Sequence, residues 1–312
     1  MNNYGEQGIP FFFFVDFEMQ QPLLYPLDAI PKNIHYHFKD FSSTNKINAK
    51  EELFPDIQAE KIPFLNYKKA FDKVYYHLNR GDSYLLNLTL KTPISLSNNL
   101  EEIYLQSNAP YKILIEDKLL CFSPEAFIHI KNGKISSFPM KGTIDANIPN
   151  AKSKLLNDYK ESCEHNTIVD LIRNDLSMVA KKVRVKRFKY IEEIKSKKST
   201  LLQMSSMISG ELNDKAELGT IIHRMLPAGS ISGAPKKRTI EIIQDAEGEK
   251  RGYYTGVFGV FNGKEMQSAV AIRFIEKSND KYFYRSGGGI TSLSECEKEY
   301  QEIIDKIYVP TT

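Results

Sequence analysis

Four glutamates are spaced in a way that could hold a divalent cation. Glu161 and Glu164 are three residues apart in one stretch, and Glu299 and Glu302 are three apart in another. Residues at positions i and i+3 share a helix face, so each pair would present two carboxylates to one side. Mg²⁺ binds oxygen and typically takes one or two carboxylates, leaving positions for water and substrate. The spacing therefore predicts a Mg²⁺ site if the two helix faces meet across a cleft, and solvated surface if they do not.

Three other segments could bind an anion. Residues 227–243, PAGSISGAPKKRTIEII, place a Gly/Ser loop before a helix, where free N–H groups and the helix dipole favour negative charge and Lys236 adds a cation. They do not form a Walker A motif, because Ala-Pro separates Gly233 from Lys236. Residues 286–290, SGGGI, offer N–H donors in an expected turn, and Arg273 in the apolar stretch AVAIRF could grip a carboxylate with both ends of its guanidinium. Together with the glutamates, these groups suit a small anion that carries more than one carboxylate.

The composition is that of an ordinary globular protein. Of its 312 residues, 41% are hydrophobic and 26% charged, and 42 basic against 39 acidic side chains leave a net charge of +3, too small to indicate nucleic acid binding. The three cysteines, 121, 163 and 296, form no CxxC pair or disulfide framework, which favours a cytoplasmic location. The N-terminal stretch with four consecutive phenylalanines lacks a basic segment, so we expect a strand and no signal peptide. We expect no membrane span, because no apolar run approaches eighteen residues.

The hydrophobic pattern predicts the elements that would position these groups. Helical spacing predicts helices over residues 64–81, 151–182, 214–226, 234–248 and 294–307. Alternating or continuous apolar runs predict strands over 83–96, several within 111–143, and others over 181–189, 201–212, 253–277 and 282–292. Strands that arrive in hairpins, with helices between groups of them, indicate a single α+β domain with antiparallel sheets.

Six motifs in order resemble the chorismate-binding enzymes, which include anthranilate, aminodeoxychorismate, isochorismate and salicylate synthases. The motifs are FPMKGT, EHNTIVDLIRNDL, PAGSISGAPKKRTIEII, RGYYTGVFGVF, AIRF and GGGITSLSECEKEYQE. The resemblance covers residues 63–308 as a catalytic core, after a shortened N-terminal region over 1–62. It implies an α/β/β/α sandwich of two large antiparallel sheets with outer helices, and an active site deep between them.

The stretch Pro139-Met140-Lys141-Gly142-Thr143 separates the branches of this family. It resembles the P-I-K-G-T motif of aminodeoxychorismate synthase component I, where anthranilate synthases have P-I-A-G-T. A single lysine is most often a solvated surface residue, but the resemblance implies that Lys141 is a nucleophile. It would add to C2 of chorismate as the C4 hydroxyl leaves, and ammonia would then enter at C4. Because only a neutral amine attacks, we expect burial or nearby cations to lower its pKa.

The resemblance also implies roles for the other motif residues. Glu125, in CFSPEAF, would be the general acid for the leaving hydroxyl. Glu164 and Glu299 would bind Mg²⁺, with Glu161 and Glu302 beside them through water. The groups expected to hold the substrate are Arg273, Tyr254, Lys306, Ser230, Gly287, Gly288, Gly289 and, near them, Lys236.

The implied activity is the conversion of chorismate and ammonia to 4-amino-4-deoxychorismate, for p-aminobenzoate and folate. The alternatives are anthranilate synthase, against which Lys141 argues, and a chorismate-fold binding protein without catalysis, against which the intact motifs argue. The family's isochorismate-type enzymes use a lysine near LLNLTL, where this chain has only Lys91 at the end. Leu85 stands where relatives carry glutamine, and Gln203-Met204 where many carry histidine. With no glutaminase segment in the sequence, ammonia would come from solution or from a separate glutamine amidotransferase subunit.

Overall fold

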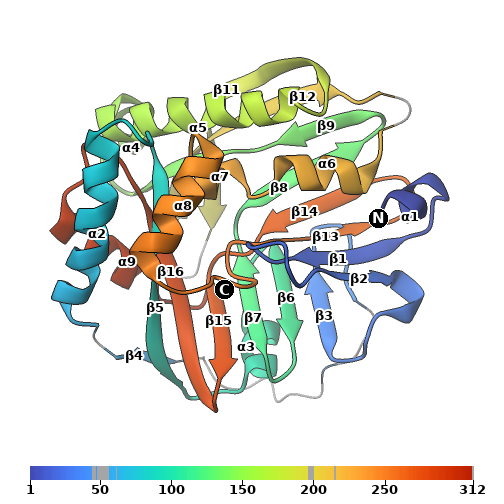
Figure 1. Ribbon diagram of the computed structural model, residues 1–312, viewed down its shortest axis with the longest axis horizontal. Helices are drawn as coiled ribbons and strands as arrows, with labels where there is room; N and C mark the ends of the chain where they lie inside the picture. The colour runs from blue at the N-terminus through green and yellow to red at the C-terminus, as the bar shows by residue number, and fades with distance from the viewer. Residues whose placement is uncertain (44–46, 48–55, 61, 196–199, 214–215, 311–312) are drawn as a thin grey trace.

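Two antiparallel sheets pack face to face in the computed structural model, which describes residues 1–43, 47, 56–60, 62–195, 200–213 and 216–310 (Figure 1). The first sheet contains nine of the described strands, in the order β10 (Met140–Asp145), β12 (Thr200–Glu211), β9 (Lys134–Ser137), β8 (Ala126–Lys131), β14 (Met266–Val270), β13 (Val257–Phe261), β1 (Phe11–Val15) and β2 (Leu23–Pro26), with β11 (Lys181–Lys195) paired to β12. The second contains seven of them, in the order β3 (Ile34–His37), β6 (Tyr111–Ile115), β7 (Leu119–Ser123), β15 (Phe274–Ser278), β16 (Lys281–Ile290), β5 (Leu86–Leu96) and β4 (Ile57–Ala59).

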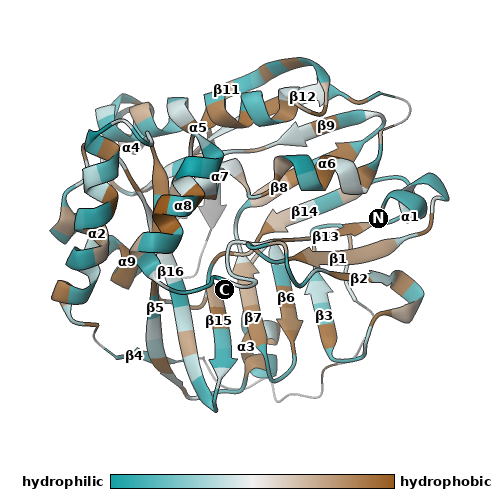
Figure 2. Cartoon of the chain, viewed as in Figure 1, coloured by the Kyte–Doolittle hydropathy of each residue, from teal (hydrophilic) through white to brown (hydrophobic). Residues whose placement is uncertain are grey.

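The run of four phenylalanines in β1 holds two layers together. Side chains alternate along a strand, so Phe12 and Phe14 pack between the sheets, in one cluster with residues of β3 and β6. Phe11 and Phe13 face the opposite side and pack against residues of α5 (Tyr159–Ser177) and α6 (Leu218–Met225). A strand buried on both faces has a continuous apolar sequence, as Figure 2 shows for β1.

Helices cover the outer faces of both sheets. On the first sheet these are α5 and α6; on the second, α2 (Phe64–Asn79), α8 (Lys236–Glu247) and α9 (Cys296–Asp305) pack on β5 and β16, and α3 (Leu100–Gln106) packs on β6 and β7. The shorter helical segments are α1 (Asn2–Glu6), η1 (Leu27–Ala29), α4 (Ala151–Asn157) and α7 (Gly229–Ser232). The expected α/β/β/α sandwich is confirmed. No helix in the described part of the chain is long and apolar enough to cross a membrane.

The N-terminal region is built into the same two sheets as the rest of the chain. It supplies β1 and β2 to the first sheet and β3 and β4 to the second. The expectation that the chain starts as a strand is only partly correct, because α1 precedes β1.

The helix expected over residues 151–182 is two helices. α4 ends at Asn157, and Asp158 then takes an extended conformation and caps α5, its side chain accepting a hydrogen bond from the Glu161 N–H at 2.9 Å. α5 ends at Ser177, because the chain enters β11 at Lys181. The break places Glu161 in the first turn of α5. The helix expected over 214–226 begins at Leu218, and residues 214–215 lie outside the described residues.

Two expectations about local conformation were wrong. Gly287, Gly288 and Gly289 do not form a turn: they lie within β16, opposite Thr89, Leu88 and Asn87 of β5. Arg273 does not lie in a strand, because it joins β14 to β15 with a φ of +56°. Most residues avoid this left-handed conformation, and those that adopt it are often found at functional sites.

Candidate active site

A cavity of about 740 Å³ brings most of the predicted site residues together. It lies where β5, β10, β16 and the helices α5, α7 and α9 converge. The predicted residues that line it are Glu125, Lys141, Glu161, Glu164, Ser230, Tyr254, Arg273, Gly287, Gly289, Glu299, Glu302 and Lys306. Gly288 and Lys236 are not among its lining residues. Its size is that of an ordinary small-molecule site.

A bulge in β10 directs Lys141 into this cavity. The pairing of β10 with β12 shifts register between Lys141 and Thr143, and the residue between them, Gly142, has a φ of +68°. A Cβ at Gly142 would lie 2.9 Å from the Leu155 side chain and 3.0 Å from a Glu161 carboxylate oxygen. The positive φ favours glycine here, and a side chain would also displace the ends of Leu155 and Glu161. The bulge re-aims the preceding side chain, as bulges next to active sites do.

The two acidic pairs do meet, and lysines lie among them. Nζ of Lys141 is 2.9 Å from Oε2 of Glu164, and Nζ of Lys160 is 3.1 Å from Oε1 of Glu299 and 3.9 Å from Oε1 of Glu164. At the other end of the cluster, Lys306 donates to Glu302 at 2.7 Å and to the carbonyl of Gly287 at 2.9 Å. The Glu164 and Glu299 carboxylates are buried, with side chains 8% and 2% exposed.

This cluster fits a divalent cation by the chemistry of its donors. Four carboxylates from two helices face one cavity, and the two deepest are bridged by an ammonium group, so the site already holds positive charge between Glu164 and Glu299. Within the part of the chain that the structure describes, no three carboxylate, imidazole or thiol groups lie close enough together to form a set of metal ligands. Hard oxygen donors are those that Mg²⁺ prefers, and Glu164 and Glu299 are the residues that would hold it.

The pKa of Lys141 is raised, contrary to the expectation that its surroundings would lower it. Burial acts to lower the pKa, but the ion pair with Glu164, reinforced by Glu161 and Glu302, outweighs it. In this state Lys141 is an ammonium ion. A neutral amine at this position would require another counter-charge for Glu164.

Glu125 has the surroundings of a general acid. It follows β7, and its carboxyl oxygen Oε1 accepts a hydrogen bond from the hydroxyl of Ser230 in α7. Burial raises the pKa of Glu125, while the Ser230 hydrogen bond and the charge of Lys141 act in the opposite direction. A raised pKa favours the protonated carboxyl group, which is the form that a general acid requires.

Arg273 and Tyr254 line the same cavity. The guanidinium of Arg273 donates to the carbonyl of Lys306 at 2.9 Å and lies 4.8 Å from the centre of the Tyr308 ring. These contacts involve one nitrogen of the guanidinium group and one face of its plane. The Tyr254 side chain is buried, and burial raises the pKa of its hydroxyl, so the hydroxyl stays a neutral donor.

Lys236 has a different role from the one expected. Its Nζ lies 2.8 Å from Oδ2 of the buried Asp175 in α5 and donates to the carbonyl of Met225 at 2.8 Å. These bonds tie α5 to both ends of the segment 225–236, which carries Ser230. We therefore leave Lys236 out of the substrate-binding set and assign it to holding this segment.

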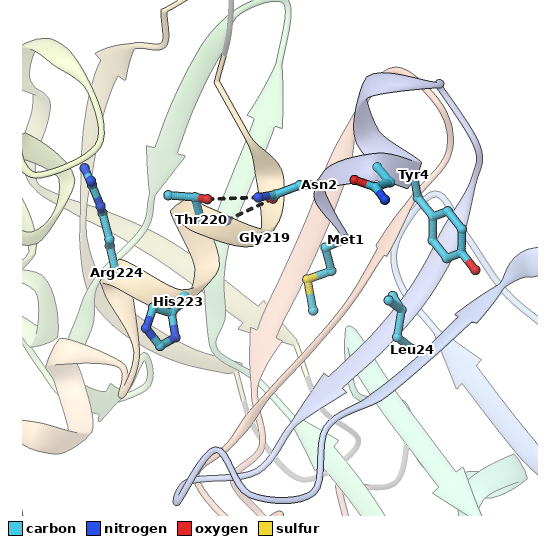
Figure 3. Close-up of a pocket in the computed structure, with 9 residues that line it drawn as sticks. Met1, Asn2, Tyr4, Leu24, Gly219, Thr220, His223 and Arg224 are labelled. Atoms are coloured by element: carbon cyan, nitrogen blue, oxygen red, sulfur yellow. Dashed lines mark hydrogen bonds between the residues drawn. The ribbon is translucent and has the colours of Figure 1, made fainter.

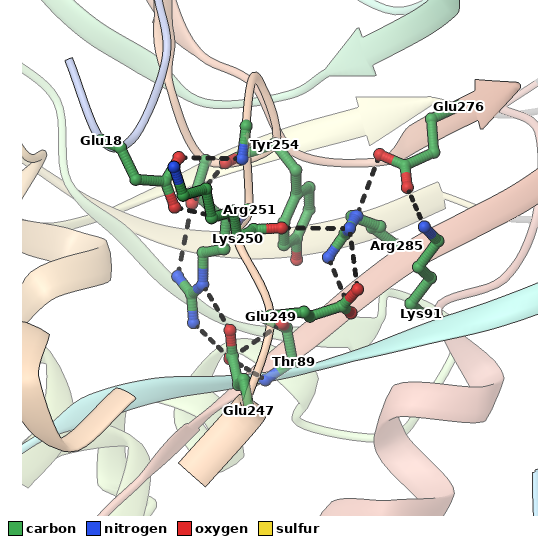
Figure 4. A network of polar contacts seen from close by, with 12 residues as sticks. Glu18, Thr89, Lys91, Glu247, Glu249, Lys250, Arg251, Tyr254, Glu276 and Arg285 are labelled. Atoms are coloured by element: carbon green, nitrogen blue, oxygen red, sulfur yellow. Dashed lines mark hydrogen bonds and ion pairs between the residues drawn. The ribbon is translucent and has the colours of Figure 1, made fainter. Parts of the chain in front are cut away.

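A buried ion-pair network lies next to the segment that carries Tyr254 (Figure 4). Arg251, 2% exposed, donates to both oxygens of Glu247 at 2.9 and 2.6 Å and to the carbonyl of Asn87 at 2.7 Å. Glu247 in turn accepts from the backbone and hydroxyl of Thr89, both at 2.9 Å. The network ties the end of α8 and the segment carrying Tyr254 to β5.

Replacing Arg251 by methionine should be strongly destabilising. Glu247 would remain buried without its cation, and breaking a buried pair in this way costs on the order of 3–5 kcal/mol. Urea unfolding would measure the loss. The exposed pair Arg238–Glu241 provides the control: Arg238→Met should change the free energy of unfolding by less than about 1 kcal/mol. Equal effects of the two substitutions would contradict this view of the network.

Sequence reasoning missed several cavity residues. Lys160 was overlooked although it lies four residues before Glu164, a spacing that pairs charges on a helix. The Oδ1 atom of Asn87 and the hydroxyl of Ser286 are buried without a hydrogen-bond partner, and both residues line the cavity. Buried polar atoms are normally paired, so these two are placed for a ligand. For Asn87 a signal existed, namely a lone amide in the apolar stretch LLNLTL.

A second hollow, of about 680 Å³, lies between α1 and α6 (Figure 3). The side chain of Asn2 bridges the two helices there, bonded to the hydroxyl of Thr220 at 3.0 Å and to its N–H at 3.1 Å. His223 and Arg224 also line it. None of the predicted site residues and no carboxylate belongs to its lining, so it does not compete with the first cavity as the metal site.

Comparison with known proteins agrees with the motifs and the fold. The chain matches the family described as chorismate binding enzyme over residues 26–312. A protein of Haemophilus influenzae named as an uncharacterized PabA-like protein is 49% identical over 99% of this chain and 94% of its own length. Aminodeoxychorismate synthase component 1 of Bacillus subtilis is 33% identical over 78% of this chain and 54% of its own length, so the chain spans about half of that relative.

Solved structures share the sandwich. Anthranilate synthase component I of Streptococcus pneumoniae superposes with a TM-score of 0.71 at 25% identity, over 86% of this chain and 62% of that one. The menaquinone-specific isochorismate synthase MenF of Escherichia coli gives a TM-score of 0.75 at 16% identity, over 97% and 78% of the two chains, which shows the fold alone. Since the family match covers most of the sequence and both sheets of the fold, this chain belongs to the chorismate binding enzyme family and is a chorismate-utilising enzyme.

Proposed function

We propose that this enzyme is an aminodeoxychorismate synthase component I, which converts chorismate and ammonia to 4-amino-4-deoxychorismate for p-aminobenzoate and folate. The observation that carries the proposal is the amine of Lys141, which the β10 bulge directs into the cavity that Glu125 and the carboxylate cluster also line. The 33% identity to the Bacillus subtilis enzyme of that name supports it.

Lys141 and Glu125 would divide the chemistry between them. The neutral amine forms a bond to C2 of the ring, the ring double bond shifts, and the C4–O bond breaks. Glu125 gives its proton to the departing hydroxyl, which leaves as water. Ammonia then bonds to C4, the double bonds shift back, and the C2–N bond breaks to return the neutral Lys141 amine. The new ammonium group at C4 loses one proton, which restores the acid form of Glu125. The ring keeps its oxidation state, so the reaction needs no redox partner.

The remaining cavity residues would bind and orient the substrate. Arg273, Tyr254 and Lys306 form a cationic and hydrogen-bonding corner suited to the enolpyruvyl carboxylate, with Ser230 and the amides of Gly287 and Gly289 beside it. A Mg²⁺ ion on Glu164 and Glu299, with Glu161 and Glu302 next to it, would supply positive charge to the ring carboxylate and replace Lys141 as the counter-charge of Glu164.

Arg273→Lys should weaken chorismate binding nearly as much as Arg273→Ala. An ammonium group cannot reproduce the planar fork that holds a carboxylate by two bonds, and losing a buried charge pair costs on the order of 2–5 kcal/mol. The measurement is the chorismate KM, which should rise in both variants. Arg238→Lys, in the exposed pair with Glu241, is the control and should leave KM as it is. An unchanged KM in Arg273→Lys would count against the carboxylate contact.

Ser230→Ala should move the alkaline limb of the pH–rate profile to higher pH. Glu125 works as an acid only below its pKa, so the rate falls as pH rises through that value. The Ser230 hydrogen bond lowers the pKa by stabilising the ionised carboxylate, and removing it raises the pKa further. Single-turnover rates of hydroxyl loss against pH would show the shift. If the alkaline limb lies at the same pH in wild type and in Ser230→Ala, then Glu125 is not the group whose ionisation produces that limb.

We also propose that glutamine-dependent activity needs a separate glutamine amidotransferase subunit in the cytoplasm. The segments around the cysteines, LLCFS, ESCEH and SECEK, show no glycine elbow for a nucleophilic thiol. All three cysteines are free.

The test is to incubate the purified chain with chorismate, Mg²⁺ and ammonium and to identify the product by mass and chromatography. The expected product is 4-amino-4-deoxychorismate. A 2-amino product or anthranilate would instead indicate an anthranilate synthase, and no conversion would indicate a binding protein. Efficient turnover with glutamine alone would overturn the separate-subunit proposal.

A further inference from the structure

Lys160 occupies the space between the two most deeply buried carboxylates of the cluster. It lies in the first turn of α5, and its ammonium contacts Glu299 of α9 at 3.1 Å and Glu164, one turn further along α5, at 3.9 Å. The chain positions of Lys160 and Glu299 differ by 139 residues. The lysine is therefore a direct ionic link between the two helices that carry the acidic pairs.

The ammonium of Lys160 offsets the electrostatic cost of burying these carboxylates. A buried carboxylate is costly unless a counter-charge is near, and here four carboxylates share one cavity. Lys141 neutralises Glu164 from inside the cavity, and Lys306 neutralises Glu302. Lys160 supplies the charge between Glu164 and Glu299, which is where a divalent cation held by these two residues would have to act.

Lys160 differs from the other two lysines in how easily it can leave. Its side chain is 42% exposed, against 24% for Lys141 and 28% for Lys306. Lys306 is also anchored by its bond to the Gly287 carbonyl. Because the Lys160 side chain is partly exposed, rotation about its side-chain bonds would return the ammonium to water once a cation takes its place beside Glu299.

We propose that Lys160 is the resident counter-ion of the metal site and that a divalent cation enters by exchanging with its ammonium group. The inference rests on the proposed function in that Glu164 and Glu299 hold the metal. It adds that the carboxylates stay assembled without metal because the lysine holds them. It follows that the affinity for the metal depends on a competition. Each ion that binds must displace the Lys160 ammonium from its place between Glu164 and Glu299.

Removing the competitor should therefore tighten metal binding. In Lys160→Met the metal-free protein leaves Glu299 without its counter-charge, while Lys141 still pairs with Glu164. The metal-bound state is unaffected, because the Lys160 ammonium has already left it. We expect the Kd for Mg²⁺ alone, measured by calorimetry on the full chain, to fall by at least roughly tenfold. The melting temperature without metal should fall by roughly 2–4 °C, and saturating Mg²⁺ should abolish the difference from wild type.

Two further variants make the experiment decisive. Lys160→Gln removes the same charge with a shorter polar side chain. It should tighten Mg²⁺ binding as Lys160→Met does, and it keeps the test available if the methionine variant folds poorly. Lys68→Met removes an equal charge from α2, where Lys68 is 44% exposed, pairs with Asp72 and does not line the cavity, and it should leave the Kd for Mg²⁺ at the wild-type value.

The outcomes separate this inference from the proposed function. Equal Kd values for Mg²⁺ in wild type and both Lys160 variants would overturn the exchange and leave the metal site standing. Weaker binding in the variants would also overturn it, because the lysine would then assist the metal rather than compete with it. If none of the four proteins binds Mg²⁺, the assignment of Glu164 and Glu299 as ligands fails and the exchange fails with it. Tightening in Lys68→Met to the same extent would show a general charge effect and would equally refute a specific exchange.

Discussion

Lys141→Ala is expected to abolish the covalent adduct between this enzyme and chorismate. When wild type is incubated with chorismate and Mg²⁺ without ammonia, intact-protein mass spectra should show an added mass of one chorismate less one water, because the C4 hydroxyl departs as the amine adds. The alanine variant has no amine at this position and should show no adduct. Formation of the 4-amino product should fall by on the order of 10³-fold or more, as for loss of other covalent nucleophiles.

Glu125→Gln and Lys68→Ala provide the comparisons. The glutamine variant keeps the lysine but lacks the proton donor, so its adduct should form slowly rather than not at all. Lys68 is partly exposed, pairs with Asp72 and does not line the cavity, so its removal should leave the adduct as in wild type. Lys141→Ala could still let ammonia attack C2 directly and yield a 2-amino product. If it makes the 4-amino product at the wild-type rate, the lysine has no covalent role.

Glu164→Gln and Glu299→Gln are each expected to lower turnover by more than roughly 100-fold while leaving the fold intact. Each carboxylate is a proposed metal ligand, and even residues that only orient such ligands commonly contribute 10–100-fold. Steady-state rates across a Mg²⁺ titration would measure the loss, and circular dichroism would report the fold. Glu297→Gln, an exposed position on the same helix, is the matched control and should keep full activity.

Glu164→Gln should have a second effect that a general loss of activity would not produce. Since Glu164 is what raises the pKa of Lys141 against the effect of burial, its neutralisation should lower that pKa. Acylation of Lys141 by a small reagent, followed by peptide mass spectrometry near neutral pH, should then be faster than in wild type. Slower or equal labelling, or full turnover of both variants after EDTA treatment, would contradict the site as described.

Much of the local structure was predictable because it depends on neighbours in the sequence. Helical apolar spacing ending near Gly81 predicted α2, and Pro235 marked the start of α8. The alternation of apolar and basic residues predicted β11. Short-range rules also placed each acidic pair on one face of a helix. Where they failed, the cause was local chemistry that was overlooked, as with Asp158, whose side chain caps α5 and divides the expected helix.

The ordered motifs by themselves indicated the family, the α/β/β/α sandwich and the set of candidate site residues. Whether the acidic pairs meet was decided only by the tertiary structure, because α5 and α9 are brought together by the packing of both sheets and not by any signal within either helix. The same holds for Lys236, which looked like an anion ligand until Asp175 of a distant helix was found to neutralise it.

The ionisation of Lys141 depends on tertiary structure most of all. Its sequence context is apolar, and burial alone would lower its pKa. A carboxylate 2.9 Å away, supplied from α5, reverses that effect. Coulomb energy between two charges depends on their separation and on the surrounding dielectric, and neither quantity is written in the order of residues along the chain. The sequence could therefore single out Lys141 and its neighbours as candidate site residues, while the charge that Lys141 carries at rest was decided by the fold.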